Sequence, residues 1–318
     1  MLDLEEPLPF PLPKAAQNVL TVVGFLVVGK ILVCAVWAAV AMLRTHLWAR
    51  LWDKRLPQTY GKWAVVTGST DGIGKSYAKE LAKKGMNILL VSRNMEKLQR
   101  VAGEIRSQYG VETDIAQADF ADGRPIYSNI EKHLTDKDIG ILVNNVGMAV
   151  HPRLYERQME DDIWAYVNVN VASVLAMTRL VLPGMLRRKK GAIVNVSSIT
   201  AHFPMAYIEV YSATKAFVSS FTRALQLEYG SSGVTIQCLE PAFVISNMTS
   251  SVEEFRTPGL FLPTSDTFAA NAVATIGYSN RTTGYWTHEL QLAWWKSFPE
   301  WYIMNGFKGF FESKQKIE

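Results

Sequence analysis

Residues 62–74 read Lys-Trp-Ala-Val-Val-Thr-Gly-Ser-Thr-Asp-Gly-Ile-Gly, and this stretch decides the fold of the 318-residue chain. Its apolar run at residues 63–67 predicts a buried strand, and the helical periodicity of residues 75–84 predicts a helix that follows. The glycines between them let the backbone turn tightly and approach a pyrophosphate, whose charge the N–H groups at a helix start attract. The spacing is G-x-x-x-G-x-G rather than the commoner G-x-G-x-x-G, but its place between strand and helix predicts a dinucleotide site.

Strand patterns alternate with helical patterns along the rest of the chain. Apolar runs predict strands at residues 63–67, 87–92, 114–118, 139–144, 192–197 and 234–239. Strands that alternate with helices pair in parallel, so we expect a doubly wound α/β sheet in a single domain. A chain of this length is ample for one such domain with a buried core.

A second motif places Tyr211 thirteen residues after Ser198 and four residues before Lys215. On a helix, residues four apart share one face, so the Lys215 ammonium can act on the Tyr211 phenol. A free tyrosine has a pKa near 10, and a nearby positive charge lowers that pKa toward the range that suits a general acid at neutral pH. Ser198 ends an apolar run and can hydrogen-bond a substrate carbonyl. Taken alone, such a pattern is more often a helix-surface pair and an ordinary strand-end serine.

With both motifs present, the sequence resembles the short-chain dehydrogenase/reductase family. The family hallmarks T-G-x-x-x-G-x-G, N-N-A-G, and S with Y-x-x-x-K correspond to residues 67–74, to residues 144–147 with Val146 in place of alanine, and to Ser198, Tyr211 and Lys215. The resemblance covers about residues 63–286 and implies a Rossmann-type fold. It implies that Tyr211 donates a proton, that Ser198 orients a carbonyl, and that Lys215 lowers the tyrosine pKa and holds the nicotinamide ribose.

The family's catalytic asparagine falls on Asn170, where it would steady a water that relays protons to the lysine; neighbouring Asn168 makes this alignment less secure. The catalytic set is therefore Tyr211, Ser198, Lys215 and Asn170.

The end of the second predicted strand indicates which pyridine nucleotide is bound. An NAD enzyme would place Asp or Glu there to hold the ribose 2′-hydroxyl, whereas this chain has Ser92, Arg93 and Asn94. The Arg93 guanidinium can neutralise a 2′-phosphate that a carboxylate would repel, which favours NADP(H); a solvated loop-end arginine is the alternative.

Two further segments resemble cofactor contacts of the family. Asp119 resembles the adenine-side residue, and residues 241–246 resemble the P-G-x-V-x-T nicotinamide segment, with Ala242 for glycine and Ser246 for threonine. The candidate cofactor-binding residues are Gly68, Ser69, Thr70, Asp71, Gly72, Ile73, Gly74, Arg93, Asp119, Asn145, Tyr211, Lys215 and Val244.

Residues 19–43 are apolar apart from Lys30 and predict a membrane-spanning helix. A helix of that length is roughly 37 Å long, enough to cross a hydrocarbon layer of about 30 Å. The acidic preceding segment and the length of the run argue against a cleaved signal peptide, and a buried soluble helix is the other alternative. Basic residues gather after the run, so the positive-inside rule puts the catalytic domain in the cytosol. They are Arg44, Arg50, Lys54, Arg55 and Lys62, against Lys14 in front.

The last five residues, 314–318, resemble a K-x-K-x-x dilysine signal that returns membrane proteins to the endoplasmic reticulum, with a solvated basic tail as the alternative. The chain thus divides into a short N-terminal segment (1–18), an anchor (19–43), a basic linker (44–61), the dehydrogenase domain (62–290) and an aromatic segment with the tail (291–318). Cys34 and Cys238 lie in apolar runs without metal-ligand spacing, which predicts neither a disulfide nor a metal site. The net charge of +4 forms no basic patch, so nucleic acid is not expected as a partner.

Large apolar side chains gather near the C-terminus. They fit a lipophilic substrate that enters from a membrane surface, and they fit core and dimer packing equally well. They are Leu260, Phe261, Leu262, Trp286, Trp294, Trp295, Phe298, Trp301, Tyr302, Phe307, Phe310 and Phe311.

Within the family, residues 63–78, 141–148 and 211–215 are most similar to the membrane-bound branch of 17-beta-hydroxysteroid dehydrogenases and very-long-chain 3-oxoacyl-CoA reductases. This resemblance implies NADPH-dependent reduction of a lipophilic ketone, either a 3-oxoacyl-CoA or a 17-ketosteroid, and a homodimer, which is common in the family. One alternative is a catalytically silent cofactor-binding scaffold like the hydroxysteroid dehydrogenase-like proteins. Some of those lack the tyrosine; this chain shares the character of their segment 281–286 but keeps Tyr211. The other alternative is a retinoid or similar lipid carbonyl as substrate.

Overall fold

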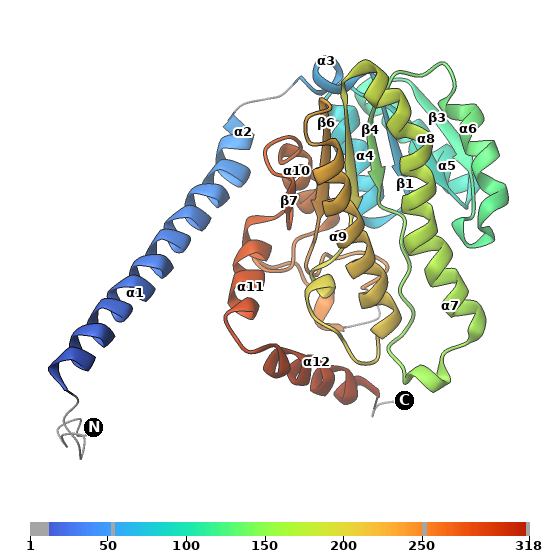
Figure 1. The fold of residues 1–318 in the computed structure, drawn as a ribbon. Helices are drawn as coiled ribbons and strands as arrows, with labels where there is room; N and C mark the ends of the chain where they lie inside the picture. The colour runs from blue at the N-terminus through green and yellow to red at the C-terminus, as the bar shows by residue number, and fades with distance from the viewer. Residues whose placement is uncertain (1–12, 52–54, 250–252, 316–318) are drawn as a thin grey trace.

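A parallel sheet lies at the centre of the molecule, with helices on both of its faces (Figure 1). The computed structural model describes residues 13–51, 55–249 and 253–315, and within them the sheet has seven strands in the order β3-β2-β1-β4-β5-β6-β7. Every neighbouring pair is parallel. The predicted doubly wound α/β fold is therefore confirmed.

Four strands have the predicted bounds: β1 (Trp63–Thr67), β2 (Asn87–Ser92), β4 (Ile139–Asn144) and β6 (Val234–Leu239). The strands β3 (Thr113–Gln117) and β5 (Gly191–Val196) begin and end one residue earlier than predicted. The sequence analysis missed β7 (Arg281–Thr282), because two residues are too few for a periodic pattern.

The strand order fixes where a ligand can bind. The chain moves outward from β1 to β2 and β3 and then returns to β4 on the other side of β1. The carboxyl ends of β1 and β4 therefore lie side by side at the point where the order reverses. In open α/β sheets, ligands bind in the crevice at this point.

Helices bury both faces of the sheet in two apolar cores. One face carries α4 (Gly72–Lys83), α5 (Met95–Tyr109) and α10 (Ser265–Ala274). The other carries α6 (Tyr127–Leu134), α8 (Ser173–Arg188) and α9 (Glu209–Tyr229). Side chains alternate between the cores along a strand, so Ala64 and Val66 lie in the first core and Val65 in the second.

A long N-terminal helix stands away from this domain (Figure 1). The helix α1 (Lys14–Met42) has no buried residue, and it continues through a π-helical turn (Leu43–Trp48) into α2 (Ala49–Leu51). The whole span Lys14–Leu51 is long and apolar enough to cross a membrane. A second helical span, Glu160–Arg188, passes the same test, but half of its most apolar window is buried, as expected for a core helix.

The predicted basic linker at residues 44–61 is largely helical. After α2, the short helix α3 (Leu56–Tyr60) packs into the first core through Leu56 and Tyr60. Lys54 and the end of the dilysine-like tail, residues 316–318, lie outside the described residues, as do residues 1–12.

Two C-terminal helices complete the fold: α11 (Trp286–Lys296) and α12 (Glu300–Gln315). The predicted boundary at residue 290 lies inside α11. Leu292 of α11 and Ile303 of α12 form a third apolar cluster with Ile199, Phe203 and Met205, which follow β5. The C-terminal helices therefore cover the loop that begins at Ser198.

Candidate active site

The glycine-rich turn joins β1 to α4 and needs its glycines for two physical reasons. Gly68 and Gly72 have φ angles of +65° and +49°, in the left-handed region that side chains disfavour. A Cβ atom built on Gly74 would lie 2.3 Å from the carbonyl oxygen of Gly68, far inside van der Waals contact. Asp71 begins α4, and its carboxylate accepts a hydrogen bond of 2.7 Å from the N–H of Gly72. The turn therefore presents bare backbone at the start of a helix, which suits a pyrophosphate.

Asn145 fastens this turn to the end of β4. Its Nδ2 donates to the carbonyl oxygen of Thr67 at 2.9 Å, and its backbone N–H donates to the Thr67 hydroxyl at 3.0 Å. The N–H of Val146 donates to the same hydroxyl at 3.0 Å. The two strand ends that border the crevice are thus held in one fixed arrangement.

The end of β2 carries cationic side chains. The side chain of Arg93 is 77% exposed and lies 3.9 Å from the Asp119 carboxylate. Ser92 is buried and its hydroxyl lies 2.9 Å from that of Thr70, which belongs to the glycine-rich turn. Lys97, which the sequence analysis missed, lies 3.8 Å from the Asp71 carboxylate. Arg93 and Lys97 are therefore both near the end of the crevice where the predicted 2′-phosphate would lie.

The predicted catalytic side chains come together where α9 passes the end of β5. Tyr211 and Lys215 lie one turn apart on α9, with the lysine Nζ 5.7 Å from the centre of the tyrosine ring. Ser198 lies near enough to the Tyr211 phenol to lower its pKa. Lys215 is buried, and its Nζ donates to the carbonyl oxygen of Val196 at 3.0 Å. The structure therefore joins the serine, the tyrosine and the lysine in one site.

Asn170 lies in a π-helical segment, Val167–Ala172, between α7 (Glu160–Tyr166) and α8. Its side-chain amide makes two hydrogen bonds with the backbone of Met148. Oδ1 accepts from the Met148 N–H at 2.8 Å, and Nδ2 donates to the Met148 carbonyl oxygen at 3.1 Å. A Cβ built on Gly147 would lie 3.4 Å from the Lys215 Nζ and 3.5 Å from the Asn170 Oδ1.

Asn170 and Lys215 thus both lie next to Gly147. The alternative candidate, Asn168, donates instead to the carbonyl oxygen of Ala121 at 2.9 Å.

Burial dominates the acid–base properties of the catalytic pair. It raises the pKa of Tyr211 to about 12, against a smaller lowering by the hydrogen bond to Ser198. It lowers the pKa of Lys215 to about 8. The pKa of Tyr211 therefore lies above its ordinary value in this structure, because burial disfavours the charged phenolate. The lowering of this pKa by Lys215 stays a prediction. Tyr211 is held in its protonated form, which is the form that a proton donor needs.

The segment at residues 241–246 closes the other side of the crevice. A Cβ built on Gly72 would lie 3.1 Å from the Cβ of Ser246, so this segment passes directly over the glycine-rich turn. The carbonyl of Pro241 accepts from the N–H of Ile199 at 3.0 Å, and the N–H of Ala242 donates to Nδ1 of His288 at 3.2 Å. The Val244 side chain belongs to the first apolar core, so its backbone is the part available to a ligand.

The sequence analysis also missed a buried charge network behind the site. Glu240 is 1% exposed and accepts hydrogen bonds from Ser219 at 2.7 Å and from Arg281 at 2.9 Å, with His202 at 3.0 Å. Burial by itself raises the pKa of this carboxyl, but the contacts with His202 and Arg281 outweigh it and lower the pKa to about 2. Ser219 in turn lies 2.9 Å from the hydroxyl of Ser197. The glutamate that precedes Pro241 was the feature of the sequence that could have pointed to this network, but the sequence does not show that its side chain is buried.

Two structural findings bear on whether the described residues form a metal site or a ligand site away from the glycine-rich turn. Within residues 13–51, 55–249 and 253–315, no group of three or more His, Cys, Asp or Glu side chains could hold a metal ion. A surface hollow of about 1020 Å³ lies between α6 and α8, and its lining includes Asn168 but none of the proposed catalytic residues. This hollow is therefore separate from the predicted catalytic residues.

Comparisons with known proteins agree with this geometry. Residues 62–257 match the family model described as short chain dehydrogenase. The human "inactive hydroxysteroid dehydrogenase-like protein 1" is 47% identical over 263 residues, which cover 82% of this chain and 80% of that protein. Human very-long-chain 3-oxoacyl-CoA reductase is 45% identical over 248 residues, covering 77% and 78%. The solved structure of a short-chain dehydrogenase from Sphingobium yanoikuyae in complex with NADPH has a TM-score of 0.61 and 30% identity, covering 66% of this chain and 82% of that one.

Proposed function

Because this chain belongs to the short-chain dehydrogenase/reductase family, we propose that it is a working, membrane-anchored reductase of a lipophilic ketone that uses NADP(H). The observation that carries this proposal is the placement of Tyr211 beside Ser198 and one helical turn from a buried Lys215. Titratable groups whose pKa values are shifted by burial cluster at functional sites.

Each side chain has a distinct role in the proposed reaction. Tyr211 donates its proton to the carbonyl oxygen, and Ser198 hydrogen-bonds the same oxygen and orients it. Lys215, still mostly charged below a pKa of about 8, stabilises the phenolate that is left and holds the ribose. Asn170 positions the backbone at Met148 and a water that returns protons toward Lys215. A bound NADPH supplies the hydride.

The residues of the crevice fit a pyridine nucleotide with a 2′-phosphate. Gly68 and Gly74 let the turn pack closely against residues 145–146 and against its own backbone, which a Cβ would prevent, and Asn145 holds the turn in place. Arg93 and Lys97 supply positive charge where the 2′-phosphate would lie. NADP(H) is therefore the proposed cofactor, and the Sphingobium relative that binds NADPH supports this choice.

The substrate class follows from the relatives and from the apolar cover of the site. The similarity to a very-long-chain 3-oxoacyl-CoA reductase favours a 3-oxoacyl-CoA, with a 17-ketosteroid as the next candidate. Ile199, Phe203 and Met205 follow Ser198 in the chain and are buried under Leu292 of α11. Apolar surroundings of this kind suit a long hydrocarbon or a steroid better than a small polar ketone.

One observation favours a second function, that of a silent cofactor-binding scaffold. The relative with 47% identity is named as inactive. This chain retains Tyr211 with Ser198 and Lys215 beside it, and Asn170 lies next to Gly147 as Lys215 does, which supports turnover.

We place the protein in the endoplasmic reticulum membrane with its domain in the cytosol. The exposed helix α1 supports the anchor, and the basic residues after it support the orientation. The division into N-terminal segment, anchor, linker, dehydrogenase domain and aromatic C-terminal segment is part of the same proposal, as is a homodimer.

The test is an NADPH oxidation assay on membranes that contain the full chain, with matched panels of 3-oxoacyl-CoA thioesters and 17-ketosteroids. We expect turnover with one panel and a clear preference for NADPH over NADH. NADPH binding without oxidation by either panel would instead establish the scaffold.

A further inference from the structure

The C-terminal helices carry two separate sets of apolar side chains. The inner set, which includes Trp295, Phe298 and Phe307, packs against the cluster around Ile199 and Phe203. The outer set faces solvent, and each of its members is between 45% and 65% exposed. We name this outer set the α11–α12 patch; it consists of Leu260, Phe261, Leu290, Trp294, Trp301 and Tyr302.

The α11–α12 patch is continuous and firmly held. Phe298 links its two helices, with its ring centre 5.0 Å from that of Trp294 and 5.4 Å from that of Tyr302. The loop at residues 260–261 is bound to α11 through its backbone: Thr287 donates to the carbonyl of Leu260 at 2.9 Å, and Gln291 donates to that of Phe261 at 3.3 Å. The ring contacts and hydrogen bonds therefore hold these large apolar side chains in place on the surface. A large apolar patch exposed on a protein surface usually marks a site that binds another molecule or a membrane.

The anchor fixes the depth at which this surface lies. His46 lies 3.8 Å from the carboxylate of Glu289 in the first turns of α11, and Arg44 donates to the carbonyl of Tyr278 at 2.8 Å. His46 is three residues beyond Leu43, where the apolar run ends, so the contact is about 5 Å along the helix from that boundary. The start of α11 is therefore held close to the level at which the anchor would leave the bilayer.

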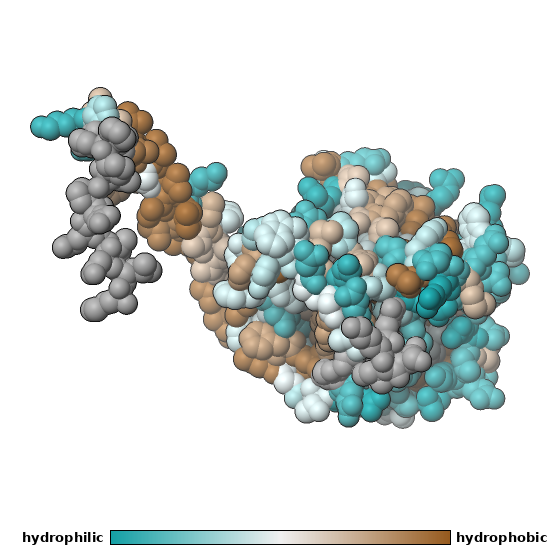
Figure 2. All heavy atoms as spheres, turned by 90° about the horizontal axis from the view of Figure 1, so that it is seen from below, coloured by the Kyte–Doolittle hydropathy of each residue, from teal (hydrophilic) through white to brown (hydrophobic). Residues whose placement is uncertain are grey.

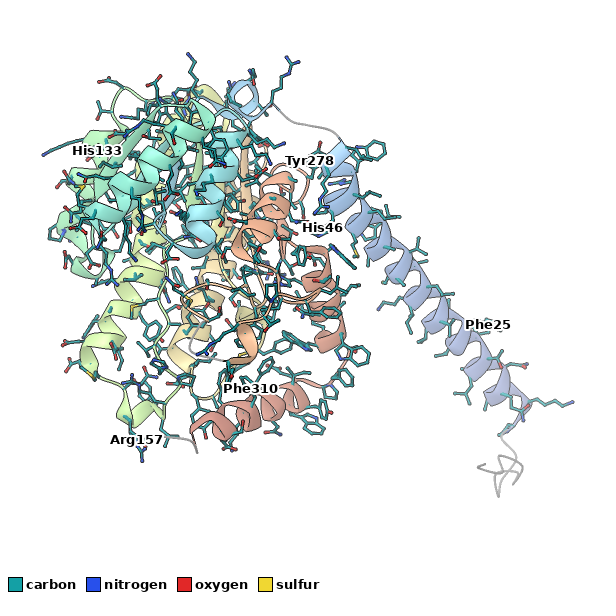
Figure 3. The ribbon with its side chains drawn as sticks, turned by 180° about the vertical axis from the view of Figure 1, so that it is seen from behind. Phe25, His46, His133, Arg157, Tyr278 and Phe310 are labelled. Carbon is teal, nitrogen blue, oxygen red and sulfur yellow. The ribbon has the colours of Figure 1, made fainter. Side chains whose placement is uncertain are left out.

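From this contact, the anchor and the C-terminal helices run toward the same end of the molecule. Figure 1 shows α11 on the side of the domain that faces α1 and α12 beneath the domain, and the view from behind in Figure 3 shows the same order, from His46 down to Phe310. Phe25 marks the exposed middle of the anchor in Figure 3. Figure 2 shows that the anchor is hydrophobic along most of its length and that hydrophobic atoms also lie on the domain beside it.

We propose that the α11–α12 patch rests in the interfacial layer of the bilayer that the anchor crosses, so that the protein contacts the membrane at two places. Trp294, Trp301 and Tyr302 are the residue types that prefer this layer, because each has a large apolar ring and a polar tip. The continuity with the anchor favours lipid over a second copy of the chain. The inner face of the same helices covers the Ser198 loop, so the α11–α12 patch and that loop lie on opposite sides of the two helices.

Spin labels on the full chain in phosphatidylcholine vesicles test this proposal. In a Cys34→Ser background, single labels are placed through Trp294→Cys or Trp301→Cys, and collision rates with oxygen, which partitions into lipid, and with a water-soluble nickel chelate are measured. The matched control is Leu227→Cys, since Leu227 is 89% exposed on α9 and lies outside the patch. A separate label on the native Cys34 in α1 reports whether the anchor itself is inserted.

We expect the labels at positions 294 and 301 to favour oxygen over the nickel chelate several-fold more than the label at position 227. Labels there that behave like position 227 while Cys34 is lipid-exposed would overturn the proposal, as would labels shielded from both reagents, which would indicate a covering protein. A label on Cys34 that is exposed to water would show that α1 does not cross the bilayer, and the proposal would then fail. Because NADPH oxidation is assayed separately on the same samples, loss of activity is not confused with loss of membrane contact.

Discussion

The cofactor end of the sheet and the cap formed by α11 and α12 border the same active site, but different interactions hold them. At the cofactor end, Gly68, Gly74 and Asn145 fix the backbone through close approach and buried hydrogen bonds. In the cap, Leu292 and Ile303 hold the helices through apolar contact with the loop after β5. A hydrogen bond is lost when one of its partners moves, whereas apolar packing tolerates substitutions that conserve the volume of the side chain. Under the proposed function, the reaction therefore depends on fixed positions at the cofactor end, and substrate choice depends on the apolar cap, whose side chains can vary.

Tyr211→Phe gives the largest expected effect and tests the cofactor end by itself. Removal of the proton donor should lower kcat/KM for the ketone by about 10²- to 10⁴-fold. NADPH binding, measured by fluorescence titration, should change little, because the ring and its helix remain. Unchanged turnover would remove Tyr211 from the proposed chemistry.

Gly74→Ala comes next, because it places a Cβ 2.3 Å from the Gly68 carbonyl and from the Asn145 amide. Because the turn must shift, we expect NADPH affinity to fall at least tenfold and the free energy of unfolding to fall by about 1–3 kcal/mol. The matched control is Gly103→Ala in α5, where a Cβ meets nothing within 4 Å. That variant should be neutral or stabilised by up to about 1 kcal/mol. Equal behaviour of the two variants would show that the turn is not closely packed.

Leu292→Ala should separate the cap from the cofactor end. Leu292 is buried between α11 and the loop after β5, and loss of such a side chain costs about 2–5 kcal/mol where the packing is tight. We expect the KM for the ketone to rise while the Kd for NADPH stays within about twofold, measured beside exposed Leu227→Ala as control. A parallel loss of NADPH affinity would mean that the two regions are one cooperative unit.

Arg93→Ala gives the smallest effect, because the guanidinium is largely exposed and solvent screens its charge. NADPH affinity should fall about tenfold and NADH affinity should not change, since only the former carries the 2′-phosphate. Arg100→Ala, an exposed arginine of α5, is the control. An equal fall for both cofactors would assign Arg93 a structural role.

The sequence predicted the sheet and the motif residues well because both depend on short-range patterns. The runs for β1, β2, β4 and β6 give the observed bounds, since buried parallel strands are nearly continuous apolar runs. Tyr211 and Lys215 were placed together by helix geometry alone.

What the sequence did not predict depends on contacts between distant segments. The raised pKa of Tyr211 comes from burial, which other elements supply. The partners of Glu240, namely His202, Ser219 and Arg281, come from three separate segments. The aromatic residues near the C-terminus divide into an inner and an outer set only when α11 and α12 are in place, because both sets have the same composition.

The central claim is that Tyr211, Ser198 and Lys215 form a working reductase site, and deuterium transfer tests it most directly. The purified full chain is incubated with NADPH carrying deuterium at the transferable C4 position and with the ketone that the assays identify, and the alcohol is examined by mass spectrometry. We predict one deuterium on the carbinol carbon with the wild-type protein and, in the same time, about 10²- to 10⁴-fold less labelled product with Tyr211→Phe. Tight NADPH binding without any labelled alcohol from the wild-type protein, across both substrate panels, would contradict the account.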